Sequence, residues 1–471
     1  MPDLTLALDI GTTSLRAVIF DPQWVIAGQS HDIIASNAPH PGWLEQDPEE
    51  IWTKTMTAAR EAIRAATATG SDVTSIGITT QRASCMVWER TTGNPLTPLV
   101  SWQDMRGIQR AHELGEQGFP LMPASSACKL ESILDAIPNG RQRMNADELC
   151  WGNIDSYIVF RLTGGAVHAT DHSQACATGY YDMQSNGWND ALLKIQDLSP
   201  DFFPELVDTS GVIGETIAKH FNATIPIGAI VGDQQSSAVA QGCTEPGDLK
   251  FTFGTSGTCN VNTGQDILSL HGTYPLVLRH ENDTTTYCIE AMIMTAGAML
   301  DWTANLLNRD GLFTDSDHPV DSSGVYVLPA LQGLGSPHAN PNQTASIVGL
   351  TRSTTPQHIA DATLEGICYR AREIVEAITE HSPHPVPERI AIDGGLSSNT
   401  RFTQLLATII AKPLAISPHQ EATALGAAVL ARHLSDSQMS YTKGSEVPPD
   451  STRIKHYSDA YEQWKSFFHL H

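Results

Sequence analysis

Apolar positions along the chain predict strands that alternate with helices. Residues 4–10 and 15–20 are two mainly apolar runs on either side of a Gly-Thr-Thr-Ser turn, a pattern typical of a β-hairpin. The same device returns in residues 247–264, where GDLKFTFGTSGTCNVNTG predicts a strand, a Gly-Thr-Ser-Gly turn and a second strand. After each hairpin come a long helical pattern and a strand that ends in small residues, at 75–81 and at 389–399. This repetition predicts two related domains.

The helices between these landmarks follow from apolar residues at intervals of three and four. They are predicted over residues 49–67, 356–379 and 400–411. The polar segment 435–450, rich in Ser and Pro, predicts a surface connection to a short final helix that contains Tyr461, Trp464 and Phe467. Strands followed by helices indicate an α/β protein.

A Gly-Cys-Thr-Glu-Pro-Gly stretch interrupts the pattern near residues 241–247, directly before the second hairpin. We therefore predict an N-terminal domain over 1–243 and a C-terminal domain over 244–471. We expect the two domains to face each other across a nucleotide cleft, each contributing one hairpin to the phosphates.

Composition narrows the classes of partner. The chain of 471 residues carries 28 basic and 52 acidic side chains, a net charge of −24, which disfavours non-specific binding to nucleic acid or to anionic lipid. No apolar run approaches the roughly 20 residues of a membrane span, and no secretory signal precedes the first strand. We expect a soluble, cytoplasmic protein. The eight cysteines have no C-x-x-C spacing, so we expect reduced, buried packing residues rather than a zinc site or disulfides.

Asp9 precedes the first turn, and its position raises a question about charge. The turn can hold phosphate, because Gly11 lets the backbone come close and successive N–H groups can converge on anionic oxygens. Asp9 would repel that phosphate unless a divalent cation stood between them, and Mg²⁺ commonly binds through one carboxylate and several waters. Taken alone, the turn also fits an ordinary hairpin; its repetition favours a phosphate site.

Eleven motifs in a fixed order cover nearly the whole chain and give it a family resemblance. They are DIGTTSLRAVIFD, GWLEQDPEEIW, GITTQR, WQDMR, GDQQSSAVAQG, FTFGTSG, AGAMLDW, LPALQGLGSPHANP, GLTRSTT, DGGLSSN and EATALGAAVLA. In this order they resemble the FGGY carbohydrate kinases, most closely the glycerol kinase branch. The resemblance implies two ribonuclease H-like domains, as in actin and heat-shock ATPases. It also implies transfer of the γ-phosphoryl group of ATP to a primary hydroxyl of a polyol or ketose, with ATP and Mg²⁺ as cofactors.

The resemblance assigns roles to residues of the N-terminal domain. Asp233, in IVGDQQ, matches the general base that accepts the proton of the acceptor hydroxyl; read alone, it is also an acid that ends a strand. Asp9 and Asp233 are the expected metal-holding residues. The residues expected near the β- and γ-phosphates are Thr12, Thr13, Ser14 and Arg16. A simple solvated arginine is the alternative interpretation of Arg16.

In the C-terminal domain the resemblance points to the nucleotide. Gly254 and Thr255 match the second phosphate contact, and Gly297 matches a position that lines the nucleotide pocket. Gly394, Gly395 and Asn399 of DGGLSSN match the adenine-binding turn, although an Asp-Gly-Gly sequence by itself is usually only a turn.

The acceptor positions depart from the glycerol kinase pattern. Ala83 and Ala124 stand where that branch has a Glu and a Tyr that bind hydroxyl groups. Their loss would weaken glycerol binding by about two orders of magnitude or more. We therefore expect an acceptor of four to six carbons, with Asp104 as a candidate replacement for the missing carboxylate. The expected acceptor-binding residues are Arg82, Trp102, Asp104, Asp233 and Gln234.

Three alternatives to this function stay open at the level of sequence. The first is a glycerol kinase proper. The second, of another class, is an ATP-driven conformational switch that acts on a protein partner, and the third is a kinase that has lost catalysis. Arg82 and the GDQQ sequence favour the kinase, since a switch needs no sugar pocket, and the intact Asp9 and Asp233 argue against lost catalysis. The expected partner is a small polyol or sugar, with a homodimer as a candidate assembly.

Overall fold

The computed structural model describes residues 3–314, 320–418, 421–432 and 444–470. The chain forms two compact units. Unit 1 contains the residues up to Ala240, the segment Leu276–Thr286 and a segment that starts at Glu421, and unit 2 contains most of the rest. The chain first leaves unit 1 after Ala240, but it returns to unit 1 twice. The first crossing lies within a few residues of the boundary between the expected domains 1–243 and 244–471, and the two returns make the compact units interleaved in sequence.

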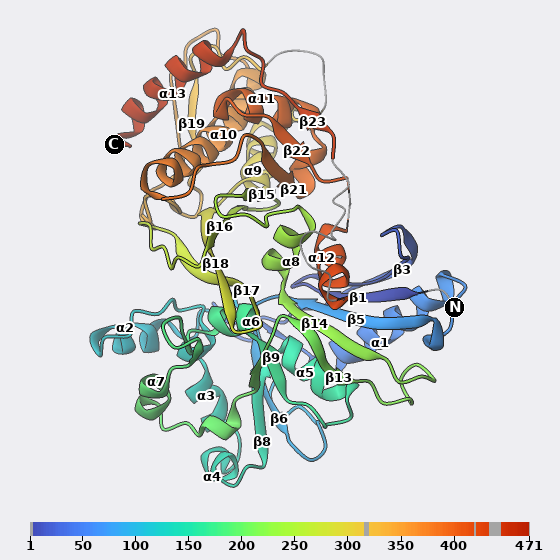
Figure 1. Ribbon diagram of the computed structural model, residues 1–471. Helices are drawn as coiled ribbons and strands as arrows, with labels where there is room; N and C mark the ends of the chain where they lie inside the picture. Colours follow the sequence, from blue (N-terminus) through green and yellow to red (C-terminus); the bar gives the residue numbers. More distant parts are fainter. Residues whose placement is uncertain (1–2, 315–319, 419–420, 433–443, 471) are drawn as a thin grey trace. The chain divides into compact units, whose positions relative to one another are not determined.

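Unit 1 is built on a six-stranded sheet (Figure 1). Its order is β13 (Ser210–Glu215), β14 (Pro226–Gly232), β5 (Val73–Thr80), β1 (Leu4–Ile10), β2 (Ser14–Phe20) and β3 (Ile26–Ile33). Strands β1, β5 and β14 are parallel neighbours, whereas β1–β2 and β2–β3 are antiparallel. The predicted first hairpin is confirmed, and its register places Asp9 opposite Arg16.

Helix α12 (Ala422–Ala431) belongs to unit 1 and packs on this sheet. The contact is close because β5 and β14 carry glycines there. A Cβ at Gly77 would come within 2.2 Å of the Ala427 carbonyl oxygen, and a Cβ at Gly228 within 2.2 Å of the Ala431 carbonyl oxygen. The Ser75 hydroxyl also donates to the Ala431 carbonyl at 2.8 Å. Only glycine therefore lets the helix backbone lie directly on the strands.

A second layer of unit 1 is a four-stranded sheet that packs around two buried tryptophans, Trp88 and Trp151. Its strands are β4 (Glu45–Gln46), β7 (Leu99–Val100), β6 (Cys85–Glu89) and β8 (Leu149–Asn153). The remaining elements of unit 1 are α1 (Pro48–Ala65), α2 (Ile108–Glu116), α3 (Leu130–Asp135), α4 (Gly140–Asn145), α5 (Ile154–Leu162), β9 (Ala169–Asp171), α6 (His172–Ala175), β10 (Tyr181–Asp182), β11 (Gly187–Trp188), α7 (Asp190–Ile195), β12 (Glu205–Val207) and α8 (Asp233–Ala240).

The large sheet of unit 2 repeats the strand order of unit 1. Its strand order is β18 (Thr284–Ile293), β16 (Gly257–Gly264), β15 (Leu249–Phe253), β21 (Ile390–Asp393), β22 (Leu414–Ile416) and β23 (Glu446–Val447). Strand β17 (Tyr274–Glu281), which precedes β18 in the chain, lies mostly in the segment that belongs to unit 1. The run β18-β16-β15-β21-β22 has two antiparallel and then two parallel pairings, as does β3-β2-β1-β5-β14. The predicted repetition is thus present in the topology as well as in the two hairpins.

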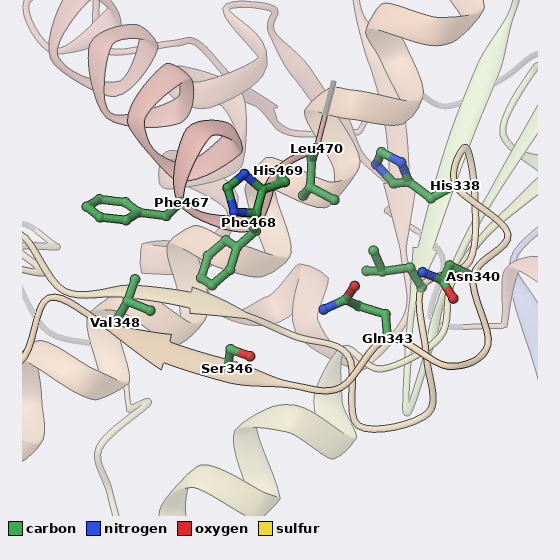
Figure 2. Close-up of a pocket in the computed structure, with 10 residues that line it drawn as sticks. His338, Asn340, Gln343, Ser346, Val348, Phe467, Phe468, His469 and Leu470 are labelled. Carbon is green, nitrogen blue, oxygen red and sulfur yellow. The ribbon is translucent and has the colours of Figure 1, made fainter.

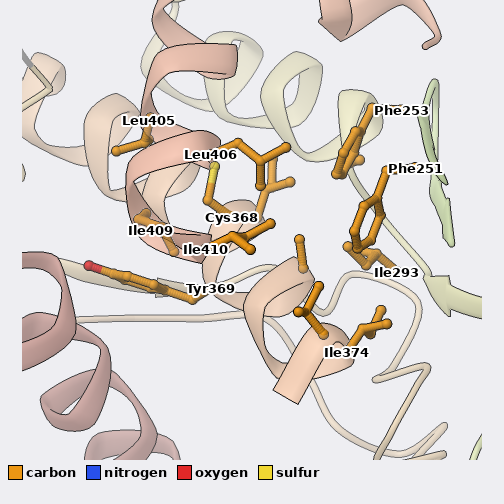
Figure 3. Packing of buried hydrophobic residues seen from close by; sticks show 14 of the residues in the cluster. Phe251, Phe253, Ile293, Cys368, Tyr369, Ile374, Leu405, Leu406, Ile409 and Ile410 are labelled. Carbon is orange, nitrogen blue, oxygen red and sulfur yellow. The ribbon is translucent and has the colours of Figure 1, made fainter. Parts of the chain in front are cut away.

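Helices α10 (Pro356–His381) and α11 (Thr400–Ile410) contribute to the core of unit 2. Figure 3 shows Phe251 and Phe253 of β15 facing aliphatic side chains from these helices. The other elements are α9 (Gly297–Leu307), β19 (Tyr326–Leu328), β20 (Ser346–Val348) and α13 (Ile454–Phe468). The helix starts follow local chemistry: Thr355 caps α10 with Pro356 at its first position, and the Asn399 side chain caps α11.

The predicted helices and hairpins agree with the structure within a few residues at each end. The mixed α/β class is confirmed. The eight cysteines all lie among the described residues and form no disulfide, and Cys176 is the one that is partly exposed. Of the predicted surface connection 435–450, residues 435–443 lie outside the described residues, and the remainder contains β23. Within the described ranges, none of the helices combines the length and the apolar character that a membrane crossing requires.

Candidate active site

The predicted site residues of unit 1 lie at the ends of three strands. The last residues of β1, β5 and β14 are partners in register, and the strands are parallel. Their carboxyl ends therefore lie at one edge of the sheet, where α/β proteins commonly place ligands. The Gly11–Ser14 turn follows β1, Arg82 lies two residues after the end of β5, and Asp233 directly follows β14. The fold thus brings together residues that are more than 200 positions apart in the chain.

Asp233 is the first residue of α8 and lies directly after the buried strand β14. The Arg82 Nε lies 3.4 Å from one Asp233 carboxylate oxygen, and the same oxygen accepts the Gln234 backbone N–H at 2.8 Å. The Asp233 side chain keeps 29% of its surface exposed. It is therefore an oriented carboxylate that solvent, or an acceptor hydroxyl, can reach.

Asp9 is buried, and its carboxylate has one partner among the residues that the structure describes. That partner is Arg16, whose Nη1 lies 3.7 Å from Asp9 Oδ2. Burial is the main cause that raises the pKa of Asp9 to about 7; Arg16 lowers it, and the charges of Asp233 and Glu421 raise it further. A buried carboxylate without a hydrogen-bond donor is costly unless a cation approaches it.

Arg16 connects Asp9 to a second acid, Glu421, which was not among the expected site residues. Its Nε lies 3.2 Å from Glu421 Oε2, at the N-terminal end of α12. Arg16 keeps 42% of its side chain exposed. It is therefore not simply a solvated arginine: two carboxylates hold it beside the first turn.

The first turn presents unpaired backbone donors. Gly11 N–H donates to the Ser14 carbonyl at 3.0 Å, which closes the turn. Within the part of the chain that the structure describes, the N–H groups of Thr12 and Thr13 have no hydrogen-bond acceptor. Thr13 is exposed, and Thr12 is half-buried. Two adjacent free N–H groups in a tight turn are the kind of donor set that binds a phosphate.

This edge of the sheet fits a metal ion that is bound by few protein ligands together with phosphate and water. Among the described residues, no cluster of three or more His, Cys, Asp and Glu side chains could hold a metal ion by itself. Mg²⁺ does not need such a cluster, because it usually binds through one or two carboxylates together with phosphate oxygens and water. The buried Asp9 carboxylate without a hydrogen-bond donor, with Asp233 close enough to raise its pKa, fits that requirement.

Trp102 lies beside the first turn. Its indole N–H donates to the Thr12 hydroxyl at 3.0 Å, and its backbone N–H donates to the Ser84 hydroxyl at 2.9 Å. The ring is partly exposed. Trp102 therefore offers an aromatic surface that is fixed to the same turn as the candidate phosphate donors.

The geometry of Asp104 argues against its expected contact with an acceptor. Asp104 is fully buried. Its Oδ1 accepts from the backbone N–H and the Nε of Arg106, and its Oδ2 accepts from Arg106 Nη2 and from the Leu44 backbone N–H, at 2.6 to 2.9 Å. These four bonds occupy the carboxylate and hold its pKa below the ordinary value despite burial. Asp104 anchors the chain around Arg106 and does not replace the carboxylate missing at Ala83.

Ala83 has a left-handed backbone, with φ +58, and is buried. Its carbonyl accepts the Ser126 hydroxyl at 3.1 Å, which joins the segment after β5 to the segment before α3. Ala124, the other departure from the glycerol kinase pattern, lies in that second segment and is half-buried. Both departures thus lie on segments of unit 1 that this bond joins, and Ala83 directly follows Arg82.

The second turn, in unit 2, resembles the first. Gly254 N–H donates to the Ser256 carbonyl at 2.9 Å, and within the described residues the Thr255 N–H has no acceptor. The start of α9 closes over this turn, since Gly297 N–H donates to the Gly254 carbonyl at 2.9 Å. A Cβ at Gly297 would lie 2.7 Å from that carbonyl oxygen, so a side chain there would push the turn away. Gly254, Thr255 and Gly297 are therefore neighbours, as their predicted shared role requires.

The expected adenine-binding residues are Gly394, Gly395 and Asn399, and they differ in whether their polar groups are open to a ligand. Gly394 has φ +86 and lies against the Phe253 carbonyl oxygen, where a Cβ would come within 2.4 Å. Gly395 is exposed and has open space where a side chain would be. Asn399 accepts the Phe402 N–H as the cap of α11 and donates to the Phe313 carbonyl at 2.6 Å. Its amide is thus engaged in the fold on both sides, and only the glycine turn offers open backbone.

A separate pocket of about 540 Å³ lies elsewhere in unit 2. Figure 2 shows His338, Asn340 and Gln343 on one side and Phe467 and Phe468 of the last helix on the other. None of the expected site residues lines it, although Leu334, His338 and Asn340 belong to the motif LPALQGLGSPHANP, and it plays no part in the chemistry that follows.

Four residues beside the first turn were not predicted from the sequence. Glu421 pairs with Arg16, and Gln46, Gln81 and Ser84 form hydrogen bonds beneath the first turn. Gln46 lies within GWLEQDPEEIW and Gln81 within GITTQR, so both were in quoted motifs. A glutamine inside an otherwise apolar or structural motif was the available signal, because a buried amide needs partners.

Two family models match the chain. The model for the N-terminal domain of the FGGY family of carbohydrate kinases matches residues 4–240, and the model for its C-terminal domain matches residues 249–434. Together they cover most of both units.

Relatives of known name and solved structures agree with these matches. The glycerol kinase of Coxiella burnetii is 35% identical over 92% of this chain and 89% of its own length, and that of Trichlorobacter lovleyi is 37% identical over 90% and 89%. The Plasmodium falciparum glycerol kinase with ADP is 27% identical, with a TM-score of 0.88 over 98% of this chain and 97% of its own. The xylulose kinase of Rhodospirillum rubrum shares the fold, with a TM-score of 0.86 at 22% identity over 99% and 98%. The chain belongs to the FGGY family of carbohydrate kinases, which are phosphotransferases with an alcohol group as acceptor.

Proposed function

We propose that this protein transfers the γ-phosphoryl group of ATP to a primary hydroxyl of a polyol or ketose of four to six carbons. The observation that carries the proposal is the convergence of three strand ends in unit 1, which places the oriented Asp233 carboxylate, Arg82 and the donor-rich first turn at one edge of the sheet. Phosphoryl transfer depends on positioning and on neutralising charge, together with a base for the attacking hydroxyl. This edge supplies each of these.

Asp233 acts as the general base in this proposal. It accepts the proton of the acceptor hydroxyl as the new oxygen–phosphorus bond forms and the bond between the β- and γ-phosphates breaks, so that ADP leaves. Arg82, 3.4 Å from Asp233, orients the carboxylate and binds the acceptor. The Trp102 ring and Gln234 complete the proposed acceptor contacts, and Asp104 is no longer among them.

The charged oxygens of ATP are the ligand of the two turns. In unit 1 the N–H groups of Thr12 and Thr13, the Ser14 hydroxyl and Arg16 are the proposed phosphate donors. In unit 2 Gly254 and Thr255 have the same role, and Gly297 and the Gly394–Gly395 turn are proposed to receive the nucleotide. Mg²⁺, held by Asp9 through water and by Asp233, would offset the charge of the phosphates. The positive charge of the hydrated ion would then stabilise the buried Asp9 carboxylate, which has no hydrogen-bond donor of its own.

Ala83 and Ala124 support an acceptor larger than glycerol. Two small residues leave space and remove two polar groups from positions where the glycerol kinase branch binds hydroxyls. Because a missing hydrogen bond to a charged group weakens binding by roughly 1.5 to 3 kcal/mol, the effect on a three-carbon acceptor would be large. The relatives named glycerol kinase support glycerol itself as the alternative acceptor.

The test is ADP release from Mg-ATP with a panel of acceptors and with none. The panel contains glycerol, erythritol, four-carbon ketoses, xylitol, xylulose, ribulose and their stereoisomers. We expect one acceptor of four to six carbons to exceed glycerol in kcat/KM by about tenfold or more. A preference for glycerol would contradict the size argument but not the kinase. A rate that no acceptor raises above the control would favour an ATP-driven switch instead.

The double substitution Ala83→Glu with Ala124→Tyr should move the preference towards glycerol. It restores the two polar groups of the glycerol kinase pattern and fills the space, so we expect kcat/KM for glycerol to rise about tenfold or more relative to that for the best larger acceptor. The measurement is the ratio of the two kcat/KM values. Ala124→Phe, which fills space without adding a hydroxyl, is the control that separates size from hydrogen bonding. An unchanged ratio in the double variant would show that other residues determine acceptor size.

A further inference from the structure

A closed ring of hydrogen bonds runs beneath the first turn of unit 1. Five residues form it: Thr12, Gln46, Gln81, Ser84 and Trp102. We call it the glutamine ring. Gln46, Gln81 and Ser84 are 2%, 1% and 0% exposed, so three of the five residues lie in the interior. Burying a polar side chain is unfavourable unless its polar atoms form hydrogen bonds. Here the amides of Gln46 and Gln81 and the hydroxyl of Ser84 all have hydrogen-bond partners.

The direction of each hydrogen bond in the glutamine ring follows from the groups that can only donate or only accept. The Thr12 carbonyl can only accept, so the Gln46 amide nitrogen must face it, at 2.6 Å. The Gln46 amide oxygen therefore accepts from Gln81 at 2.9 Å. The Gln81 amide oxygen in turn accepts from the Ser84 hydroxyl at 3.0 Å, and that hydroxyl accepts the Trp102 backbone N–H at 2.9 Å. No member can reverse its bond without leaving a buried group unpaired.

The ring closes at the Thr12 hydroxyl. An indole N–H can only donate, so in the 3.0 Å contact with Trp102 the Thr12 oxygen is the acceptor. The hydrogen of the Thr12 hydroxyl is consequently directed elsewhere and is available to a phosphate oxygen. Gln81 also donates to the Gly11 carbonyl at 3.2 Å, so the backbone of the turn is held from the same side as its side chain.

We propose that the glutamine ring is a relay between the acceptor segment and the phosphate turn, with Gln46, Gln81 and Trp102 as positioning residues. Trp102 lies in the segment that the proposed function assigns to the acceptor, and Thr12 lies in the turn that it assigns to the phosphates. The inference rests on that proposed function. It adds that Trp102 acts on phosphoryl transfer through the Thr12 hydroxyl, in addition to any contact of its ring with the acceptor.

A double-mutant cycle tests this relay with the best acceptor of the panel. Trp102→Phe keeps an aromatic ring but removes the indole donor together with part of the ring surface, whereas Thr12→Val removes the hydroxyl. We expect Trp102→Phe to lower kcat/KM for Mg-ATP about five- to tenfold while changing the KM for the acceptor less than about twofold. In the Thr12→Val background the same change should cost less than about twofold, because its target is already absent.

The matched control is Trp188→Phe. The Trp188 indole N–H donates to the Pro204 carbonyl at 3.0 Å, so this change removes the same bond at a position outside the glutamine ring. We expect wild-type kinetics from it. Gln81→Met provides a second approach to the ring: it should also lower kcat/KM for Mg-ATP more than it raises the acceptor KM, and thermal unfolding shows whether the variant is folded. Trp102→Phe decides the question if Gln81→Met does not fold.

The outcomes separate the relay from the proposed function. Equal losses from Trp102→Phe with and without the Thr12 hydroxyl would overturn the relay, and so would wild-type kinetics of Trp102→Phe or a loss confined to the acceptor KM. In each of these cases the wild type still phosphorylates its acceptor. A wild type without acceptor-dependent ADP release would overturn the proposed function, and the relay with it.

Discussion

Replacing Asp233 with Asn should lower kcat by about 10²- to 10⁴-fold, the range of rate that a positioned general base contributes. Asn keeps the shape and an oxygen that faces Arg82, but it does not accept a proton. Arg82 lies 3.4 Å from Asp233, so the local geometry should survive the change. The measurement is the steady-state rate of ADP release at saturating Mg-ATP and acceptor.

Asp135→Asn is the matched control for this result. Asp135 also faces an arginine, with Arg141 Nε 2.8 Å from its Oδ1, but it lies at the end of α3, away from the three strand ends. We expect its kcat to stay within about twofold of the wild type, as for a partly exposed ion pair. If Asp233→Asn kept more than about a tenth of the wild-type kcat, Asp233 would not be the base.

Asp9→Asn should change activity and stability in opposite directions. Loss of the carboxylate that would hold the hydrated Mg²⁺ should lower kcat/KM for Mg-ATP about 10- to 100-fold, the usual effect of removing an outer partner of a metal. Without ligand, the same change removes a charge that burial destabilises. The pKa of Asp9 is raised to about 7 from an ordinary 3.8, so below about pH 4 both folded and unfolded chains hold the proton.

Between these two pKa values the folded chain holds a proton that the unfolded chain has released, so the stability of the wild type falls as the pH rises towards 7. Asn has no proton to lose. We therefore expect Asp9→Asn to be more stable than the wild type by about 2 kcal/mol or more at pH 8, with a much smaller difference at pH 5. The measurement is urea unfolding at the two pH values in the absence of Mg²⁺ and nucleotide.

Asp155→Asn serves as the control for this pair of effects. Asp155 is also buried, and burial raises its pKa to about 7, but its partner is the Thr170 hydroxyl at 2.6 Å. The Asp155→Asn variant should be more stable than the wild type at pH 8 and should keep the wild-type activity. A destabilised Asp9→Asn at pH 8 would mean that Arg16 compensates the Asp9 charge fully in the free protein.

The fold was predictable because its signals are local and repeated. The two hairpins, at residues 4–20 and 247–264, each combine strand-forming runs with a short glycine-containing turn, and long helices such as α10 have clear apolar spacing and caps. The interleaving of the units was not predictable in this way. Nothing in the local pattern of residues 276–286 or of α12 says which sheet each one joins, because that depends on pairings between distant segments.

The site was predictable where a residue lies within one or two positions of a strand end, as Asp233 and Arg82 do. Asp104 shows the limit of that reasoning. A carboxylate in a motif near the acceptor can equally be an anchor, and whether it is depends on Arg106, two residues later, folding back onto it. Gln46 and Gln81 show the reverse case: an uncharged amide gives a weak signal in sequence, and its importance follows only from the carbonyls that the fold places around it.

The packing of α12 on glycines of β5 and β14 has a consequence for biosynthesis. A ribosome completes the six-stranded sheet of unit 1 by Gly232, but the helix that covers Gly77 and Gly228 is made only when residues 422–431 emerge, after nearly all of unit 2. Until then the nascent sheet exposes a bare apolar face, which is a surface for chaperones or for aggregation. The sheet formed by the first half of the polypeptide therefore cannot complete its packing until one of the last segments has been translated.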